Sequence, residues 1–426
     1  MTQAAWIEAA LTSARPQALA ALLRYFRDLD TAEEAFQDAC LRALKTWPQK
    51  GPPRDPTAWL VFVGRNVAID AVRRRSKLQE LPPEEVLTDL DDTESELVER
   101  LDSADYRDDL LRLLFVCCHP DLPPPQQIAL ALRVVSGLSV QQIARAFLVG
   151  EAALEQRITR AKSRIAASAV PFDTPSPAER TARLGVVATM IYLLFNEGYS
   201  STAESTALRK QLCEEAIRLA RLLLRLFPGE PEMMGLVALL LLQHARSAAR
   251  LDANGAIVLL EDQDRELWDR TLIAEGLALI DKAVRHRQPG AYQIQAAIAA
   301  LHSRAPCAAD TDWAQIDLLY AALERLQPSP VVTLNRSVAI AKTRGPEAAL
   351  AMIEPLGARL SGYFHFHGAR GAYLQQLGRE DEARDAFQRA ISLAGSAAEA
   401  AHIRLHLDQL AKRSAHGTAL AGNRPE

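Results

Sequence analysis

Four basic side chains recur along one short stretch of the chain and could bind the phosphates and base edges of a nucleic acid. They are Arg157, Arg160, Lys162 and Arg164. Lysine and arginine neutralise phosphates, and arginine can donate two hydrogen bonds to the major-groove edge of guanine. Apolar residues lie between them at helical spacing, namely Leu154, Ile158, Ala161 and Ile165. We therefore expect a helix with one buried face and a basic side that stays accessible.

A second helix must hold this basic helix in place. The stretch before it also has apolar residues at helical spacing, namely Leu138, Ile143, Ala144 and Phe147. Val149 and Gly150 interrupt the pattern. Residues 137–165 therefore predict a helix-turn-helix that reads DNA with its second helix. The alternative is an ordinary helical hairpin with a solvated basic face.

Charge is unevenly distributed along the 426 residues, although the formal net charge is only −4. Residues 76–109 hold three basic and thirteen acidic residues, a net of −10. Residues 1–75 carry a net of +3, and residues 110–170 a net of +4. Two mildly basic segments are thus separated by an acidic one. Such an uneven distribution of charge influences which partners each segment attracts.

Composition narrows the class of protein. No apolar run is long enough to span a membrane, and the first residues lack the basic start of a signal peptide. Five cysteines, an odd number in a large chain, favour a reducing compartment, so we expect a cytoplasmic protein. Alanine and leucine dominate over β-branched and aromatic runs. The predicted fold class is therefore all-α.

The helices divide into predicted domains. Within residues 1–75, prolines force a loop at 50–56, and a helix is expected over 57–75. That helix ends in three arginines. Their positive charge can stabilise the negative end of the helix dipole or bind a phosphate backbone. Residues 76–109 are expected to form a flexible acidic linker, because few of them could enter a core. Residues 110–170 then form a second small domain that contains the helix-turn-helix.

A Pro-rich stretch near 171–177 precedes a third predicted domain, residues 181–412, in which Ala/Leu-rich helices are broken by Pro and Gly. Its clearest unit is 364–394, with small and apolar residues at tetratricopeptide spacing. A related pattern at 345–348 lies about one repeat upstream. Two units are fewer than the three that usually bury a stable core, so we expect a repeat-like α-helical domain.

Three motifs in this order resemble bacterial extracytoplasmic-function RNA polymerase sigma factors. Residues 32–38 with 41–43 are similar to their polymerase-binding helix. Residues 59–60, 65–70 and 73–75 are similar to their promoter-melting helix. Residues 157–162 are similar to their promoter-reading helix. The resemblance covers about two fifths of the chain, and the remainder resembles a subgroup with a long helical, tetratricopeptide-like C-terminal extension.

The resemblance implies a sigma factor that directs RNA polymerase core to specific promoters, with core bound through the coiled coil of its largest subunit. The residues implied to bind polymerase are Glu33, Glu34, Gln37, Asp38 and Arg42. Those implied to bind DNA are Arg65, Asn66, Asp70, Arg73, Arg74, Arg75, Glu155, Arg157, Arg160 and Lys162. A base leaving the stack would enter a pocket near the 52–59 loop, with Trp59 itself expected in the core.

The chain departs from the family pattern at two places in the helix-turn-helix. Leu148 stands where the turn often has glycine, and Glu155 stands where lysine is frequent. A carboxylate can accept a hydrogen bond from cytosine N4, so Glu155 is expected to read a base. Promoter preference therefore does not carry over from relatives.

The sequence contains no motif typical of an enzyme or of a metal site. Adjacent Cys117 and Cys118 point apart on a helix, and no second Cys/His pair follows His119 at zinc spacing. A Gly-rich phosphate loop, a nucleophile elbow and a His-Glu-x-x-His helix are all missing from the sequence. We expect no catalysis, no metal and no cofactor.

Two other functions stay open. A helix-turn-helix regulator that works without polymerase core would explain residues 137–165 but not 32–75. A tetratricopeptide-type interaction scaffold would explain 181–412 but leaves both basic segments without a role. In the sigma-factor hypothesis, 181–412 is a regulatory domain that packs on the N-terminal domains and binds a regulatory protein or ligand.

Overall fold

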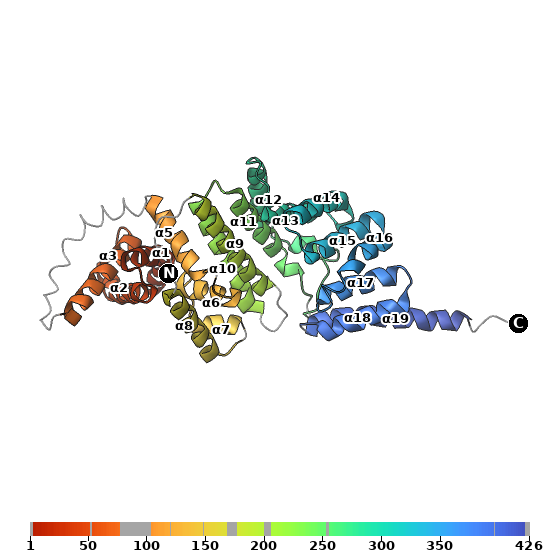
Figure 1. Ribbon diagram of the computed structural model, residues 1–426, viewed down its shortest axis with the longest axis horizontal. Helices are drawn as coiled ribbons and strands as arrows, with labels where there is room; N and C mark the ends of the chain where they lie inside the picture. The colour runs from red at the N-terminus through yellow and green to blue at the C-terminus, as the bar shows by residue number, and fades with distance from the viewer. Residues whose placement is uncertain are drawn as a thin grey trace. The chain divides into compact units, whose positions relative to one another are not determined.

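The structure is a computed structural model that describes residues 3–51, 53–76, 104–119, 121–147, 149–167, 177–199, 206–252, 255–395 and 397–421. Within these ranges every regular element is a helix, apart from one isolated β-bridge between Leu251 and Ile257. The all-α fold class is confirmed. The chain forms two compact units, Met1–Glu197 and Gly198–Glu426. Figure 1 labels the helices of both units in chain order.

The first unit begins with a three-helix bundle of α1 (Gln3–Phe26), α2 (Leu29–Lys50) and α3 (Pro56–Ser76). Asp28 caps α2, because its carboxylate accepts a hydrogen bond from the backbone N–H of Thr31 at 2.8 Å. Gly64 lets α3 lie close to α2, since a Cβ there would be 2.9 Å from the carbonyl oxygen of Ala35. The helix predicted over 57–75 is confirmed.

Tryptophans fill one end of this bundle. The buried ring of Trp47 stacks on Trp6 with centroids 6.0 Å apart and meets Trp59 edge-on at 5.3 Å. Trp59, which was expected in the core, is half-buried and packs against the buried Trp47 ring.

A second bundle follows in the same unit, made of α5 (Ala104–Cys117), α6 (Pro124–Val134), α7 (Val140–Ala146) and α8 (Glu151–Ala167). Helix α5 packs on both α1 and α6, and α8 packs on α6 and α7. The predicted helix-turn-helix is thus α7 and α8. Six of the predicted inward positions are buried, namely Ile143, Ala144, Leu154, Ile158, Ala161 and Ile165.

The structure differs from prediction at the end of the acidic segment, which was expected to be a linker up to residue 109. Helix α5 already begins at Ala104. Asp109 is buried and forms ion pairs with Arg24 of α1 and Arg112 of α5, so this acidic residue belongs to a packed helix. Residues 77–103 lie outside the described ranges.

The first unit closes with α9 (Pro177–Tyr199), which buries Leu184, Ile191 and Phe195. The division between the two units falls after Glu197, two residues before α9 ends. The Pro-rich stretch near 171–177 lies almost wholly outside the described residues, and its last proline begins α9.

The second unit is a succession of helices in which neighbours along the chain pack pairwise. They are α10 (Thr206–Leu226), α11 (Pro231–His244), α12 (Arg270–Val284), α13 (Ala291–Arg304), α14 (Trp313–Leu326), α15 (Pro330–Arg344), α16 (Pro346–Ile353), α17 (Phe364–Gln376), α18 (Glu380–Leu393) and α19 (Ala397–Ala421). The pair α17/α18 coincides with the predicted unit 364–394, and the predicted pattern at 345–348 lies where α15 ends and α16 begins. Gly371 allows the second pair to approach closely, because a Cβ there would be 2.6 Å from the ring of Phe387.

Candidate nucleic-acid interface

Helix α8 presents a basic side to solvent. Its apolar stripe is buried, Arg160 is exposed and Arg157 is half-buried. Neither guanidinium forms a hydrogen bond or ion pair with any residue that the structure describes. Arg164 is engaged differently, because its Nη1 donates to the carbonyl oxygen of Asp121 at 3.0 Å. Arg157 and Arg160 are thus the cations of α8 that a phosphate or base could meet, and Glu155 is exposed beside them.

The carboxylates of α2 form a second accessible surface. Four of the five residues predicted to bind polymerase are exposed, namely Glu34, Gln37, Asp38 and Arg42. Glu33 is the exception, with only 6 % of its surface exposed. It lies one turn before buried Phe36 and so borders the packed face of the helix. The exposed face of α2 can meet another protein without any change to the bundle.

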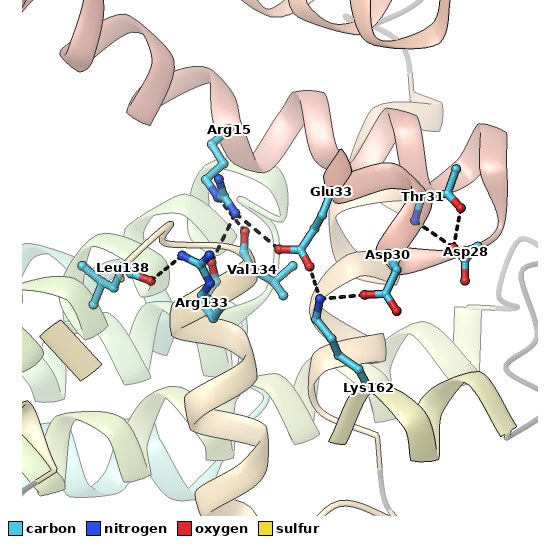
Figure 2. Close-up of polar contacts among 9 residues, drawn as sticks. All are labelled: Arg15, Asp28, Asp30, Thr31, Glu33, Arg133, Val134, Leu138 and Lys162. Carbon is cyan, nitrogen blue, oxygen red and sulfur yellow. Dashed lines mark hydrogen bonds and ion pairs between the residues drawn. The ribbon is translucent and has the colours of Figure 1, made fainter. Parts of the chain in front are cut away.

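Lys162 connects the two surfaces. Figure 2 shows its ammonium pointing from α8 to α2, where Nζ lies 2.7 Å from Oδ1 of Asp30 and 2.5 Å from Oε2 of Glu33. Burial alone lowers the pKa of Lys162, but the hydrogen bonds to both carboxylates outweigh it and hold the pKa above its ordinary value. Lys162 is therefore a charged group already satisfied within the chain, and in this arrangement it cannot also bind a phosphate.

Arg15 of α1 fixes the same junction from the other side (Figure 2). Its Nε donates to the carbonyl oxygen of Val134 at 2.9 Å, and its Nη2 donates to that of Arg133 at 3.3 Å. These carbonyls end α6, where a positive charge is favoured by the helix dipole. Nη2 of Arg15 also lies 3.6 Å from Oε1 of Glu33. Burial lowers the pKa of Arg15, and the nearby Glu33 carboxylate opposes that shift.

A cavity of about 360 Å³ lies at this junction. It is lined both by residues predicted to bind polymerase and by one predicted to bind DNA. The lining residues are Asp30, Glu33, Glu34, Gln37, Arg133, Ile158 and Lys162. The structure thus brings Glu33 and Lys162 together, although the sequence assigned them to different partners. Sequence reasoning missed Arg15, Asp30 and Arg133, which complete the junction.

The predicted promoter-melting residues lie on α3. Arg65 and Asn66 are exposed, and the guanidinium of Arg65 sits 4.6 Å from the centroid of the Tyr25 ring. Asp70 and Arg73–Arg75 belong to α3, but their side chains lie outside the described part of the chain, as do Pro52 and Leu148. The structure therefore places only the first part of this surface.

The rejected metal site is a pair of buried thiols. Cys117 and Cys118 are fully buried, which raises the pKa of both. Among the residues described, no group of His, Cys, Asp or Glu side chains could hold a metal ion. Nor does any helix in those ranges combine the length and apolar character needed to cross a membrane.

Comparison with known proteins assigns both bundles. Residues 11–78, which span most of α1 to α3, match Sigma-70 region 2. Residues 112–165, which end in the helix-turn-helix, match Sigma-70, region 4. The chain belongs to the extracytoplasmic-function sigma factors and carries a C-terminal extension. Sigma factors of these families are DNA-binding transcription initiation factors and are not enzymes.

The extension of this sigma factor matches a family of unknown function over residues 183–284. Over 415 residues this sigma factor is 70% identical to an uncharacterized protein of Rhizobium meliloti (strain 1021). The matched region covers 97% of this chain and 98% of that protein. No solved structure matches the chain. The extended architecture is thus shared along almost the full length of both proteins.

Proposed function

We propose that this sigma factor binds RNA polymerase core through the exposed face of α2 and binds promoter DNA through the basic side of α8. On α2 the binding residues are Glu34, Gln37, Asp38 and Arg42, with Glu33 becoming available when the junction opens. On α8 they are Arg157, Arg160 and Lys162, with Glu155 reading a base. The guanidinium groups of exposed Arg160 and half-buried Arg157 support this assignment, because they have no hydrogen bond or ion pair with a described residue and can engage phosphates without breaking one.

The observation that carries the proposal further is the contact of Lys162 with Asp30 and Glu33. It uses one residue from each proposed surface, so neither surface is complete while it persists. We infer that the two bundles close on each other in the free protein and separate when core and promoter are bound. The pair with Asp30, which is 66% exposed, contributes little, about 0.2–1 kcal/mol, whereas the Glu33 carboxylate is 7% exposed and is paired in a site shielded from water. Opening would expose Glu33 to solvent or to a partner, so bound core and promoter would have to replace the contacts that it loses.

The second unit is proposed to act as a regulatory domain of the sigma factor. Several of its arginines are held by carboxylates within the unit, as Arg336 is by Asp317 at 2.6 Å and Glu324 at 2.7 Å. Such neutralised groups add little to DNA binding, which favours a role in binding a protein or small ligand. Its signal would act on the first unit and thereby on transcription.

The test is capture of RNA polymerase core by the full chain, followed by run-off transcription from promoters recovered by genome-wide binding of the tagged protein. We expect stoichiometric core binding and promoter-dependent transcripts. DNA binding without core binding would instead assign a helix-turn-helix regulator. Loss of both, with protein partners recovered on the second unit, would assign a scaffold.

A further inference from the structure

The second unit contains a cavity of about 300 Å³ between the 259–265 loop and helices α13, α14 and α15. Its floor includes the buried side chains of Ile316 and Ala339, and aromatic rings of Trp313 and Tyr320 line it. Small-molecule sites typically measure ~300–1,000 Å³ and are mostly apolar with a few placed polar groups. The cavity therefore has the size and lining for a small organic molecule.

Two opposite charges lie side by side on the cavity wall. Nζ of Lys342 on α15 is 2.7 Å from Oε2 of Glu261 in the loop, and their side chains are 43 % and 49 % exposed. The ammonium of Lys342 also lies 5.9 Å from the centroid of the Trp313 ring. Because an exposed ion pair is weak, either charge can exchange its partner for a ligand group.

Two further polar side chains line the cavity and have no hydrogen-bond partner among the residues that the structure describes. The His302 ring meets Trp313 edge-on with centroids 5.2 Å apart, and the amide of Asn335 projects from α15. Burial, together with nearby Arg246 and Arg265, lowers the pKa of His302 to about 4. The neutral imidazole therefore offers one donor and one acceptor rather than a charge.

Arg265 fixes the loop against the helices. Its Nη1 donates to the carbonyl oxygens of His302 at 2.5 Å and Ala305 at 2.6 Å, at the end of α13. Its guanidinium also sits 4.6 Å from the centroid of the Trp268 ring. The loop that carries Glu261 is thus anchored, so that Glu261 stays beside Lys342 when a ligand enters.

We propose that this cavity binds a free α-amino acid with an apolar or aromatic side chain. The side chain would enter against Trp313 and Tyr320, the α-carboxylate would bind Lys342, and the α-ammonium would bind Glu261. A simple carboxylate would leave Glu261 unpaired, and a simple amine would leave Lys342 unpaired. Only a zwitterion replaces both halves of the ion pair, so the pair selects for it.

Calorimetric titration of the full chain tests the proposal with three compounds that share one phenylethyl body. They are L-phenylalanine, phenethylamine, which lacks the carboxylate, and 3-phenylpropionate, which lacks the ammonium. We expect L-phenylalanine to bind at least about tenfold more tightly than either, a difference of ~1.4 kcal/mol. Tighter binding of the amine or the acid, or no binding of L-phenylalanine and L-leucine, overturns the proposal.

Substitutions of the ion pair sharpen the test. Lys342→Met should reduce the affinity for L-phenylalanine to that for phenethylamine, and Glu261→Gln should reduce it to that for 3-phenylpropionate. Both replaced side chains are partly exposed, so the fold does not depend on them. Lys282→Met, at an exposed lysine of α12, is the matched charge control and should bind like wild type. Unchanged binding by Lys342→Met contradicts the site.

A filled cavity gives an independent check. Val338→Trp on α15 should abolish binding, since Val338 lines the cavity. Val284→Trp places the same ring at another exposed valine, which lines a separate cavity of about 270 Å³, and should leave binding intact. Retained binding in Val338→Trp contradicts the location. The titration uses neither polymerase nor DNA, so its failure would leave the proposed sigma function untouched.

Discussion

Nζ of Lys162 lies 2.5 Å from Oε2 of Glu33, although the two residues are 129 positions apart in the chain. The contact joins the helix that resembles a promoter reader to the helix that resembles a polymerase ligand. Because each side chain is satisfied by the other, promoter and polymerase must compete with an internal partner. The apparent affinity for each partner is then the intrinsic affinity multiplied by the fraction of molecules that is open.

Arg15→Met is expected to favour the open form. The change removes the hydrogen bonds to the carbonyls of Arg133 and Val134 but alters no residue proposed to bind DNA or polymerase. Every ~1 kcal/mol lost from the closed form raises the open population, and the promoter affinity, about fivefold while the closed form dominates. Fluorescence anisotropy with a labelled promoter fragment measures this. Arg225→Met, at an exposed arginine of α10, is the control; equal affinity in both variants would argue against a closed form.

Glu34→Lys combined with Asp38→Lys should abolish core binding, because both side chains are exposed on the proposed polymerase face of α2. Far-UV circular dichroism should be unchanged, since neither residue is packed. Co-sedimentation with core polymerase provides the readout. The paired change Asp381→Lys and Asp385→Lys repeats the spacing and the charge reversal on α18 and should bind core normally. Normal affinity of the α2 variant for core polymerase would contradict the assignment of α2 as the polymerase-binding helix.

Arg157→Ala and Arg160→Ala should each weaken promoter binding by about 1–3 kcal/mol. A lost phosphate contact lowers the salt dependence of binding, whereas a lost base contact relaxes specificity at one position. Binding isotherms at several salt concentrations separate the two cases. Wild-type transcription by both variants from a cognate promoter would mean that the recognition helix has been misplaced.

Local sequence patterns were sufficient to predict the helix-turn-helix. Helical spacing depends only on residues one or two turns apart, so the burial of Ile143, Leu154 and Ile158 follows directly from it. The prediction for Trp59 is confirmed only in part, because the ring packs on Trp47 but stays half-buried. The two repeat units were predictable for a similar reason, because small residues such as Gly371 mark close helix contacts.

The junction between the bundles could not be predicted in this way. Arg160 and Lys162 are both basic residues of α8, yet Lys162 is half-buried against carboxylates of α2 and Arg160 is exposed. The difference arises from docking of α8 and α6 against α1 and α2, a long-range event that leaves no periodic signal. The burial of Glu33 had a partial signal, since it precedes Phe36 by one helical turn. The cavity proposed to bind an α-amino acid could not be predicted either, because it forms where a loop and three helices meet.

Acid should destabilise the second unit through His302. Its pKa is about 4 in the folded state and ~6.5 when unfolded, so its contribution is fully present above pH 6.5. As the pH falls towards 4, the unfolded state binds a proton that the folded state does not, and up to ~3 kcal/mol is lost. Urea unfolding at pH 7 and pH 4.5 measures the loss. His302→Gln should lose less between these values; an equal loss in both proteins would contradict the assignment.

Removal of the second unit should reduce transcription. A fragment ending at Tyr199 retains α9, which belongs to the first compact unit, whereas one ending at Pro171 lacks it. We expect the 1–199 fragment to bind core but to give run-off transcripts reduced on the order of fivefold, the low end of typical coupling between sites. Thermal unfolding of each fragment establishes that the first unit is intact. If the 1–199 fragment drives the cognate promoter as well as the full chain does, the extension has no regulatory role, and its repeat-like helices act as a separate interaction scaffold. A loss seen only with the 1–171 fragment would assign the effect to α9 rather than to the second unit.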